Sequence, residues 1–317
     1  MKCSAFWKHT NIRPGNRVFP CCRFKTPVAE FTGDLEAVLH SKAYEQLRTK
    51  SENGEHIAGC EKCYYEESIG HKSLRQEFNE QYNTDSVGLE YIEIGIDNLC
   101  NMACDGCNSE FSTKWIAKEE LIYGTAQNKY LDTETVTSVP STVKKILFVG
   151  GESLLTERHL DVLGKHSNPE ICTVIYNTNA SVIPSDECLA QWRDFKRVHF
   201  IISIDGVGET QERVREGAQW QDLLDFVAWC ETHNFEFEFN TVLHLNNCDN
   251  LDELIAFVKP YNRDWYINVL TYPKHLDIAN HDRQTLEKLL SSYRTKDFPN
   301  KDYICNHIEN SLHQSQQ

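Results

Sequence analysis

The sequence of 317 residues has too little positive charge for a protein that coats nucleic acid. It holds 32 lysine and arginine residues against 47 aspartate and glutamate residues, a net charge of −15. Phosphate binding needs a basic face, so we expect no bulk binding of nucleic acid. No stretch reaches the roughly 20 apolar residues of a membrane helix, so we expect no membrane span. The start, "MKCSAFWKHTNIRPG", lacks the apolar core of a signal peptide, which predicts a cytoplasmic protein.

Cysteine, in contrast, is plentiful, with 13 residues. Disulfides are disfavoured in the cytosol, so clustered cysteines indicate metal or redox chemistry. Five cysteines lie in the first 63 residues, and three more lie in "LCNMACDGCN" at 99–108. The remaining five are scattered singly, and we interpret most of them as small buried hydrophobic residues. These five are Cys172, Cys188, Cys230, Cys248 and Cys305.

From about residue 89 onward, short β-rich runs alternate with helical patterns. Strands are predicted at 89–96, 143–150, 171–177, 197–204, 235–243 and 264–270. Helices are predicted at 112–123, 154–166, 186–195, 220–233, 251–258 and 283–292. Six βα units in a row predict a parallel sheet, either an open doubly wound sheet or a partial barrel. In both folds function lies on the loops after the strands, and the cysteine triplet directly follows the first strand.

The N-terminal 88 residues have a different pattern. They contain a Pro/Gly turn, an extended piece at 17–22, and helical segments around 35–50 and 73–82. The predicted domains are therefore a cysteine-rich module over 1–88, an α/β domain over 89–296 and a C-terminal tail over 297–317. The polar stretch 125–142 is predicted to be a loop within the first crossover.

The triplet of Cys100, Cys104 and Cys107 supplies three thiolates, which suit zinc or an iron–sulfur cluster. A structural zinc site needs a fourth ligand, and the sequence holds no cysteine or histidine between Cys107 and His159. A cubane held by three thiolates leaves one iron without a protein ligand, as a catalytic cluster requires. On spacing alone, zinc-binding or incidental cysteines remain an alternative.

The neighbouring motifs favour the cluster. "FVGGESLL" ends the second predicted strand, "YNTNA" follows the third, "ISIDG" ends the fourth, and "RVREG" comes shortly after. Each motif alone is modest, but this order at successive strand ends is hard to reach by chance. Together with CxxxCxxC after the first strand, they resemble the radical S-adenosylmethionine (SAM) superfamily over about residues 89–275.

The resemblance implies a partial (β/α)6 TIM-like barrel whose triplet holds a [4Fe-4S] cluster. S-adenosylmethionine would complete that cluster through its amino and carboxylate groups, and its reductive cleavage would give a 5′-deoxyadenosyl radical that abstracts hydrogen from a substrate. The matching positions assign cofactor binding to Gly150, Gly151, Glu152, Thr178, Asn179, Ser203, Asp205, Arg215 and Asn240. Among these, Ser203 and Arg215 would hold the carboxylate or ribose, and Asp205 would shape the turn. The family usually has an aromatic residue before the last cysteine, where this sequence has Gly106.

The N-terminal cysteines carry a second resemblance. "CSAFW", "NRVFPCC" and "GCEKCYYEE" are similar in layout to SPASM and twitch modules, although those modules usually follow the barrel. The resemblance implies an auxiliary [4Fe-4S] cluster, with Cys22 as the alternative to Cys21 among its ligands. Four thiolates with a CxxC pair also suit a structural zinc site. The implied ligands are Cys3, Cys21, Cys60 and Cys63.

Function is accordingly predicted as a radical SAM enzyme, of oxidoreductase-like or transferase class, that modifies a peptide or protein. The alternatives are a small-molecule or nucleotide substrate, and a non-catalytic iron–sulfur binding module. An electron donor such as flavodoxin or ferredoxin is the expected partner. Cys248, just past the fifth strand, and Cys305, in the tail, are candidate hydrogen-atom donors, although buried thiols are the simpler interpretation of both.

Overall fold

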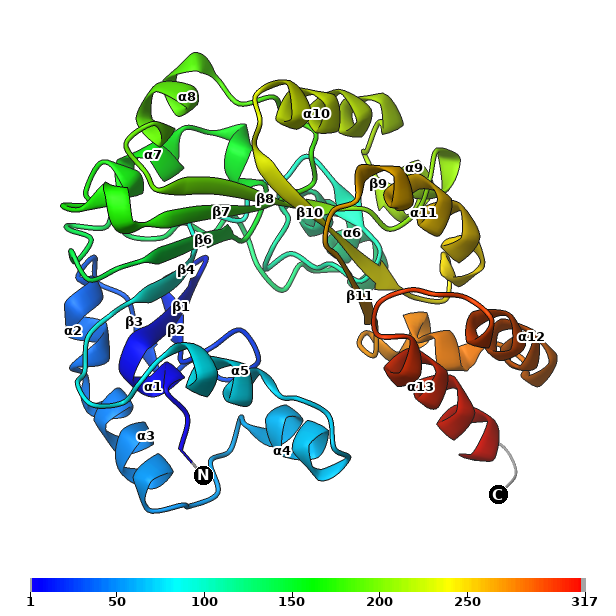
Figure 1. Cartoon of the computed structure of the whole chain (residues 1–317), viewed down its shortest axis with the longest axis horizontal. Helices are drawn as coiled ribbons and strands as arrows, with labels where there is room; N and C mark the ends of the chain where they lie inside the picture. Colours follow the sequence, from blue (N-terminus) through cyan, green and yellow to red (C-terminus); the bar gives the residue numbers. More distant parts are fainter. Residues whose placement is uncertain (1, 315–317) are drawn as a thin grey trace. The chain divides into compact units, whose positions relative to one another are not determined.

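The computed structural model describes residues 2–314, in which strands alternate with helices (Figure 1). The strands are β1 (His9–Arg13), β2 (Arg17–Phe19), β3 (Ala29–Glu30), β4 (Tyr91–Gly95), β5 (Ala103–Cys104), β6 (Lys145–Val149), β7 (Thr173–Thr178), β8 (Arg197–Ser203), β9 (Arg215–Glu216), β10 (Glu236–Leu243) and β11 (Trp265–Val269). The α-helices are α1 (Ala5–Lys8), α2 (Leu35–Leu39), α3 (Lys42–Glu52), α4 (Glu61–Ser68), α5 (Leu74–Gln81), α6 (Thr113–Tyr123), α7 (Arg158–Leu163), α8 (Asp186–Trp192), α9 (Glu209–Val214), α10 (Trp220–Thr232), α11 (Leu251–Val258), α12 (Arg283–Arg294) and α13 (Lys301–Gln314).

All six predicted strands form, as β4, β6, β7, β8, β10 and β11, and each boundary lies within two residues of its predicted place. Alternate side chains of β10 are buried, as a strand with one face against helices requires. The stretch 125–142 contains no helix or named strand, as predicted.

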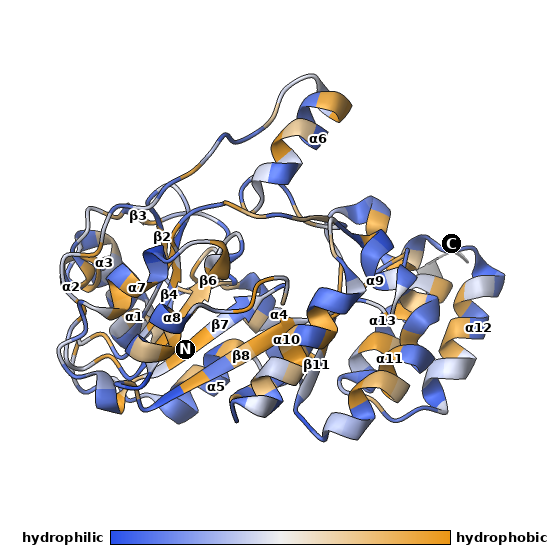
Figure 2. Cartoon of the chain, turned by 90° about the horizontal axis from the view of Figure 1, so that it is seen from above, coloured by the Kyte–Doolittle hydropathy of each residue, from blue (hydrophilic) through white to orange (hydrophobic). Residues whose placement is uncertain are grey.

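The chain divides into two compact units. The first unit comprises residues up to 99, 127–176 and 184–198. Its strands are ordered β7-β6-β4-β1-β2-β3, and β4, β6 and β7 run parallel. Phe148 of β6 stacks on Tyr176 of β7, and this face is covered by His159 of α7 and Trp192 of α8. Figure 2 colours most of β6 as hydrophobic, in keeping with this burial.

The second unit comprises residues 100–126, 177–183 and those from 199 onward. Its parallel strands are ordered β11-β10-β8, and the short β5 and β9 pair antiparallel in a separate ribbon. Phe200 of β8 packs edge-on against Phe226 of α10. Helices α11, α12 and α13 enclose an apolar cluster that includes Leu251, Leu290 and Ile308.

Within each unit, the parallel strands that the sequence predicts are neighbours in chain order. A doubly wound sheet reverses its strand order at a switch point, whereas a singly wound barrel does not. The observed orders β4-β6-β7 and β8-β10-β11 follow the singly wound pattern. The prediction of an α/β fold built on a mostly parallel sheet is confirmed.

β1, the helices over 35–52 and the C-terminal helix are among the elements that differ from the sequence prediction. β1 lies parallel to β4 and extends the sheet of the first unit, with His9 opposite Tyr91. The helical segment at 35–50 is two helices, because Ser41 begins a new helix by accepting a hydrogen bond from the Tyr44 amide. The C-terminal tail holds α13, which buries Ile304 and Ile308 against α12. The predicted division into domains at 88 and 296 remains a prediction.

Among the described residues, no helix is both long enough and apolar enough to cross a membrane.

Candidate functional site

The cysteine triplet lies in the loop that follows β4, and the loop is fixed by strand pairing. Within it, β5 pairs antiparallel with β9, which places Cys104 opposite Arg215. The Asp105 amide donates to the Val214 carbonyl at 2.8 Å. The Cys100 amide lies 3.3 Å from Oγ1 of Thr113, the first residue of α6. All three cysteines are reduced and partly exposed, so the loop presents their thiols as a set.

Gly106 turns the chain between the second and third cysteines. Its φ of +75° lies in the left-handed region, and an added Cβ would come within 2.8 Å of the Leu270 side chain. The Cys107 amide donates to the Cys104 carbonyl at 3.2 Å, which closes the turn. The Trp115 indole donates to the same carbonyl at 2.9 Å. The superfamily that the sequence resembles usually has an aromatic residue at this position. Glycine stands here instead because the left-handed backbone strongly favours it.

Two polar side chains approach the sulfur atoms. Asn179 Nδ2 lies 3.9 Å from Cys100 Sγ, and Arg215 Nη1 lies 3.7 Å from Cys104 Sγ. Burial raises the pKa of Cys104, and the Arg215 guanidinium opposes that rise. The pKa of Cys107 is raised to about 12, mainly by burial and to a smaller extent by the charge of Cys104. Raised thiol pKa values favour the protonated form, so a metal that binds these two sulfur atoms would displace protons.

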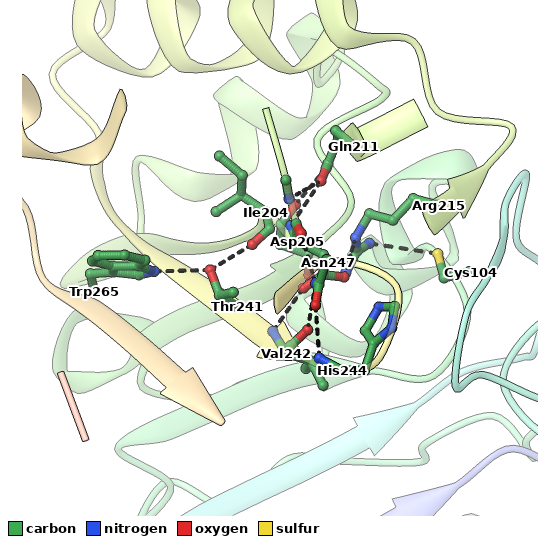
Figure 3. A network of polar contacts seen from close by, with 12 residues as sticks. Cys104, Ile204, Asp205, Gln211, Arg215, Thr241, Val242, His244, Asn247 and Trp265 are labelled. Carbon is green, nitrogen blue, oxygen red and sulfur yellow. Dashed lines mark hydrogen bonds and ion pairs between the residues drawn. The ribbon is translucent and has the colours of Figure 1, made fainter. Parts of the chain in front are cut away.

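Arg215 belongs to a polar network at the ends of β8 and β10 (Figure 3). Its Nε donates to Asp205 Oδ2 at 2.7 Å, and both side chains are buried. Asp205 Oδ1 accepts the Val242 amide at 2.8 Å. Asn247 Nδ2 donates to the Asp205 carbonyl at 2.7 Å. Gln211 Oε1 accepts the Asp205 amide at 2.8 Å, so the turn after β8 is held from several sides.

The glycine-rich turn after β6 packs against the end of the β4 segment in the first unit. A Cβ on Gly151 would lie 2.0 Å from the Leu99 carbonyl oxygen, and Gly150 has a φ of +111°. The Glu152 amide donates to the Leu99 carbonyl at 2.7 Å, and Leu99 directly precedes Cys100 in the chain. The carboxylate of Glu152 is buried and accepts the Leu154 amide at 3.2 Å.

The remaining predicted cofactor residues lie at strand ends of the second unit. Thr178 Oγ1 accepts the Ala180 amide at 3.0 Å, and Asn179 Oδ1 accepts the Ser181 amide at 3.0 Å. Ser203 and Asn240 are register partners on β8 and β10, so both side chains face the same side of the sheet. Asn240 Oδ1 is buried and has no hydrogen-bond partner among the described residues.

The N-terminal cysteines gather around one cavity in the first unit. Cys3, Cys21, Cys60 and Cys63 all line it, and Cys22 does not. Burial raises the pKa of Cys3 to about 12 and that of Cys60 to about 11, with the neighbouring cysteines contributing to both shifts. The cavity is otherwise lined by apolar groups and two arginines. These further residues are Ala5, Phe6, Arg23, Gly59, Leu74, Arg75 and Phe78.

The two candidate hydrogen-atom donors are both buried. Cys248 Sγ lies 3.2 Å from His281 Nε2, and burial raises the pKa of this thiol to about 12. Cys305 lies on α13 in the same apolar cluster. A donor role for either thiol remains a prediction.

Several residues that hold the site belong to none of the motifs quoted above. Asn247 and Gln211 fix the Asp205 turn, and Asn246 Nδ2 donates to Asp105 Oδ2 at 2.8 Å. Arg23 and Arg75 also lie outside those motifs; they line the N-terminal cavity and pair with Glu66 and Glu67. The only sequence signal was the asparagine-rich "LHLNNCDN", since asparagine side chains often bond nearby backbone in turns.

The donor set fits an iron–sulfur cluster. Within residues 2–314, no three His, Cys, Asp or Glu side chains are arranged to hold a single metal ion as they stand. The thiolates of a cubane bind different irons, and the seven candidate ligand cysteines provide only sulfur ligands. The positive charge of Arg215 beside Cys104 suits an anionic cluster.

The chain is similar to several known proteins. No model of a protein family matches the chain. It is 24% identical over 204 residues to the GTP 3′,8-cyclases of Listeria welshimeri and Listeria monocytogenes, which covers 63% of this chain. The matched region spans 58% of the length of these curated relatives. The chain is thus similar in sequence to these GTP 3′,8-cyclases, and its ordered motifs and the cysteine loop after β4 resemble the radical S-adenosylmethionine superfamily.

Solved structures with a similar fold include native anSMEcpe with bound AdoMet (TM-score 0.47, 16% identity). That match covers 65% of this chain and 59% of the other. The structure of Streptococcus suis SuiB bound to S-adenosylmethionine is a second example (TM-score 0.42, 13% identity). The match to SuiB covers 78% of this chain and 58% of the SuiB chain.

Proposed function

We propose that the chain is an enzyme that reductively cleaves S-adenosylmethionine and modifies a substrate by radical chemistry. Cys100, Cys104 and Cys107 would hold the [4Fe-4S] cluster. The observation that carries the proposal is the loop after β4, in which β5–β9 pairing and Gly106 fix three partly exposed thiols with no fourth protein thiol beside them in sequence. When bound, cluster and cofactor supply one-electron chemistry that yields a 5′-deoxyadenosyl radical.

Several polar groups of the second unit would bind and orient the cofactor. Asn240 Oδ1 is buried without a partner among the described residues, and Ser203 lies beside it in register. A buried acceptor of this kind is costly unless a ligand satisfies it. Thr178 and Asn179 shape the turn next to Cys100. The resemblance to the radical SAM superfamily also assigns cofactor binding to Gly150, Gly151 and Glu152.

The N-terminal cavity would hold the auxiliary [4Fe-4S] cluster. Its lining by Cys3, Cys21, Cys60 and Cys63 supports this ligand set over one with Cys22. Four thiolates would close the cluster, so its role would be electron transfer or substrate contact. A reduced flavodoxin or ferredoxin would supply electrons.

A peptide or protein is the substrate that we propose first, because the two cysteine sets together resemble twitch and SPASM enzymes. A nucleotide is the second candidate, and the similarity to GTP 3′,8-cyclases favours it specifically. Anaerobic incubation with GTP, and separately with peptides encoded beside the gene, would separate these candidates by product mass.

Cofactor cleavage tests the proposed function directly. Under anaerobic, reducing conditions the reconstituted protein should form 5′-deoxyadenosine. The variants Cys100→Ala, Cys104→Ala and Cys107→Ala should each lose this activity completely. Cys230→Ala, which removes a buried thiol on α10, is the matched control and should stay active. Wild-type cleavage by any of the three loop variants, or none by the wild type, would contradict the proposal; the second result would favour a non-catalytic binding module.

A further inference from the structure

Backbone pairing brings Arg215 beside Cys104. The pairing of β5 with β9 makes Arg215 the register partner of Cys104, and Ala103 the partner of Glu216. Just after β9, Gly217 has a φ of +100°, and a Cβ there would lie 2.7 Å from the Asn101 carbonyl oxygen. The two segments therefore approach as closely as backbone allows, and the position of Arg215 does not depend on its side chain.

The guanidinium of Arg215 is also oriented. Its Nε is engaged by Asp205 Oδ2 at 2.7 Å, which leaves Nη1 3.7 Å from Cys104 Sγ (Figure 3). Only 12% of the Arg215 side chain and 8% of the Asp205 side chain are exposed. Asp205 is itself fixed, because its other oxygen accepts the Val242 amide of β10. A planar guanidinium held at one edge has its remaining N–H groups in fixed directions.

We propose that Arg215 is a positioning residue of the cluster, which donates an N–H group to the Cys104 sulfur and sets the reduction potential. The inference rests on the proposed function, because it presumes a [4Fe-4S] cluster on the triplet. It differs from the role that the family resemblance implies, in which Arg215 binds the carboxylate or ribose of S-adenosylmethionine. Hydrogen bonds and positive charge at cluster sulfurs stabilise the reduced, more negative state. Arg215 should therefore make this cluster easier to reduce.

Redox titration without S-adenosylmethionine separates the two roles. The reduced-cluster electron paramagnetic resonance signal of the triplet is the one that Cys100→Ala abolishes. In Arg215→Gln the midpoint potential of this cluster should become more negative. At the midpoint potential of the wild type, the reduced fraction of the cluster should then be several-fold smaller in the variant than in the wild type. Arg215→Lys should give an intermediate shift, because lysine keeps the charge but not the fork of donors. Arg213→Gln removes the same charge from an exposed position two residues away and should match the wild type.

The iron content of each variant is measured together with its redox titration. If Arg215→Gln and Arg215→Lys both titrate like the wild type while only cofactor affinity falls, Arg215 binds the cofactor and the inference is wrong. If Arg215→Gln does not fold, Arg215→Lys alone tests the inference. A midpoint potential of Arg215→Lys equal to that of the wild type would then show that the inference is wrong. If the wild type shows no signal that Cys100→Ala removes, the proposed function fails, and this inference fails with it.

Discussion

At the scale of single residues, Gly151 shows how the glycine-rich turn is constrained by the chain itself. An added methyl group would lie 2.0 Å from the Leu99 carbonyl oxygen, and this atom belongs to backbone that cannot rotate away. The same carbonyl accepts the Glu152 amide. The glycine therefore keeps the turn seated on the residue that precedes Cys100.

The variant Gly151→Ala should lose about 2 kcal/mol of unfolding free energy, the usual cost of forcing extra atoms into a packed site. Cofactor cleavage should fall with it, because the turn and the start of the cysteine loop shift together. Gly88→Ala is the control, since nothing lies within 4 Å of a Cβ there. Urea unfolding and 5′-deoxyadenosine formation measure the two effects. An alanine variant as stable and active as Gly88→Ala would show that the turn has room after all.

The motifs predicted which residues serve the cofactor, and that assignment stays a prediction; they did not predict the contacts among these residues. The order of the motifs predicted that Arg215 and Asp205 would serve one cofactor. The approach of Arg215 to Cys104 could not be predicted, because β5 and β9 are two-residue strands, too short to leave a periodic signal. Their pairing depends on a register between segments more than a hundred residues apart in sequence.

At the scale of elements, β1 is a strand that the sequence analysis missed. Its sequence HTNIR is mostly polar, although four of its five residues are buried. The reason is a buried polar cluster with β4. Glu93 accepts hydrogen bonds from Asn11 Nδ2 and, at 3.1 Å, from the Tyr91 hydroxyl, and His9 lies 3.4 Å from the same carboxylate. Apolar periodicity cannot reveal a strand whose buried partners are polar.

Glu93→Gln should destabilise the chain by about 2 kcal/mol at pH 7, the scale of a hydrogen-bonded buried charge. Burial opposes ionisation of Glu93, but the nearby His9 ring and the hydrogen bond from Asn11 hold its pKa below the usual value. A depressed folded-state pKa contributes stability that is present above the unfolded value of 4.5 and is lost as pH falls through the folded pKa. The difference between wild type and variant should therefore shrink below about pH 4.5. Urea unfolding at several pH values measures it.

The control for that series is Glu134→Gln, which removes an exposed carboxylate from the same unit. It should leave stability within about 0.5 kcal/mol of the wild type at every pH. A constant difference between wild type and Glu93→Gln from pH 7 to pH 3 would show that the carboxylate of Glu93 is not the ionised acceptor of the cluster.

At the scale of the whole molecule, the seven candidate ligand cysteines form two sets. Three lie in the loop after β4, in the second unit, and four line the N-terminal cavity of the first unit. The local CxxxCxxC pattern predicted the triplet, whereas the resemblance to SPASM and twitch modules implied the ligand set of the N-terminal cavity. The sequence could not show that Cys21 lines the cavity and Cys22 does not. Adjacent residues in a turn differ in the direction in which their side chains point, and two neighbouring cysteines carry no sequence signal for that direction.

A double variant, Cys60→Ala with Cys63→Ala, tests whether the first set carries a redox cluster that acts on substrate. Two cubanes would give roughly eight irons per chain against four for one, so the variant should lose about half of its iron. The loop after β4 is untouched, so slow, uncoupled cleavage of S-adenosylmethionine should persist while substrate turnover is lost. Iron analysis and product quantification measure both.

The matched control is Cys172→Ala with Cys188→Ala, which removes two buried thiols from the same unit outside the cavity. This control should keep its full iron. If the Cys60 and Cys63 variant is insoluble while the control folds, the metal serves to hold together a region with little core of its own. If the anaerobically purified wild type carries four irons and one zinc, the N-terminal site is structural. Zinc would then be held by the same four thiolates, because a set of four cysteine ligands satisfies its tetrahedral preference without any open position for substrate.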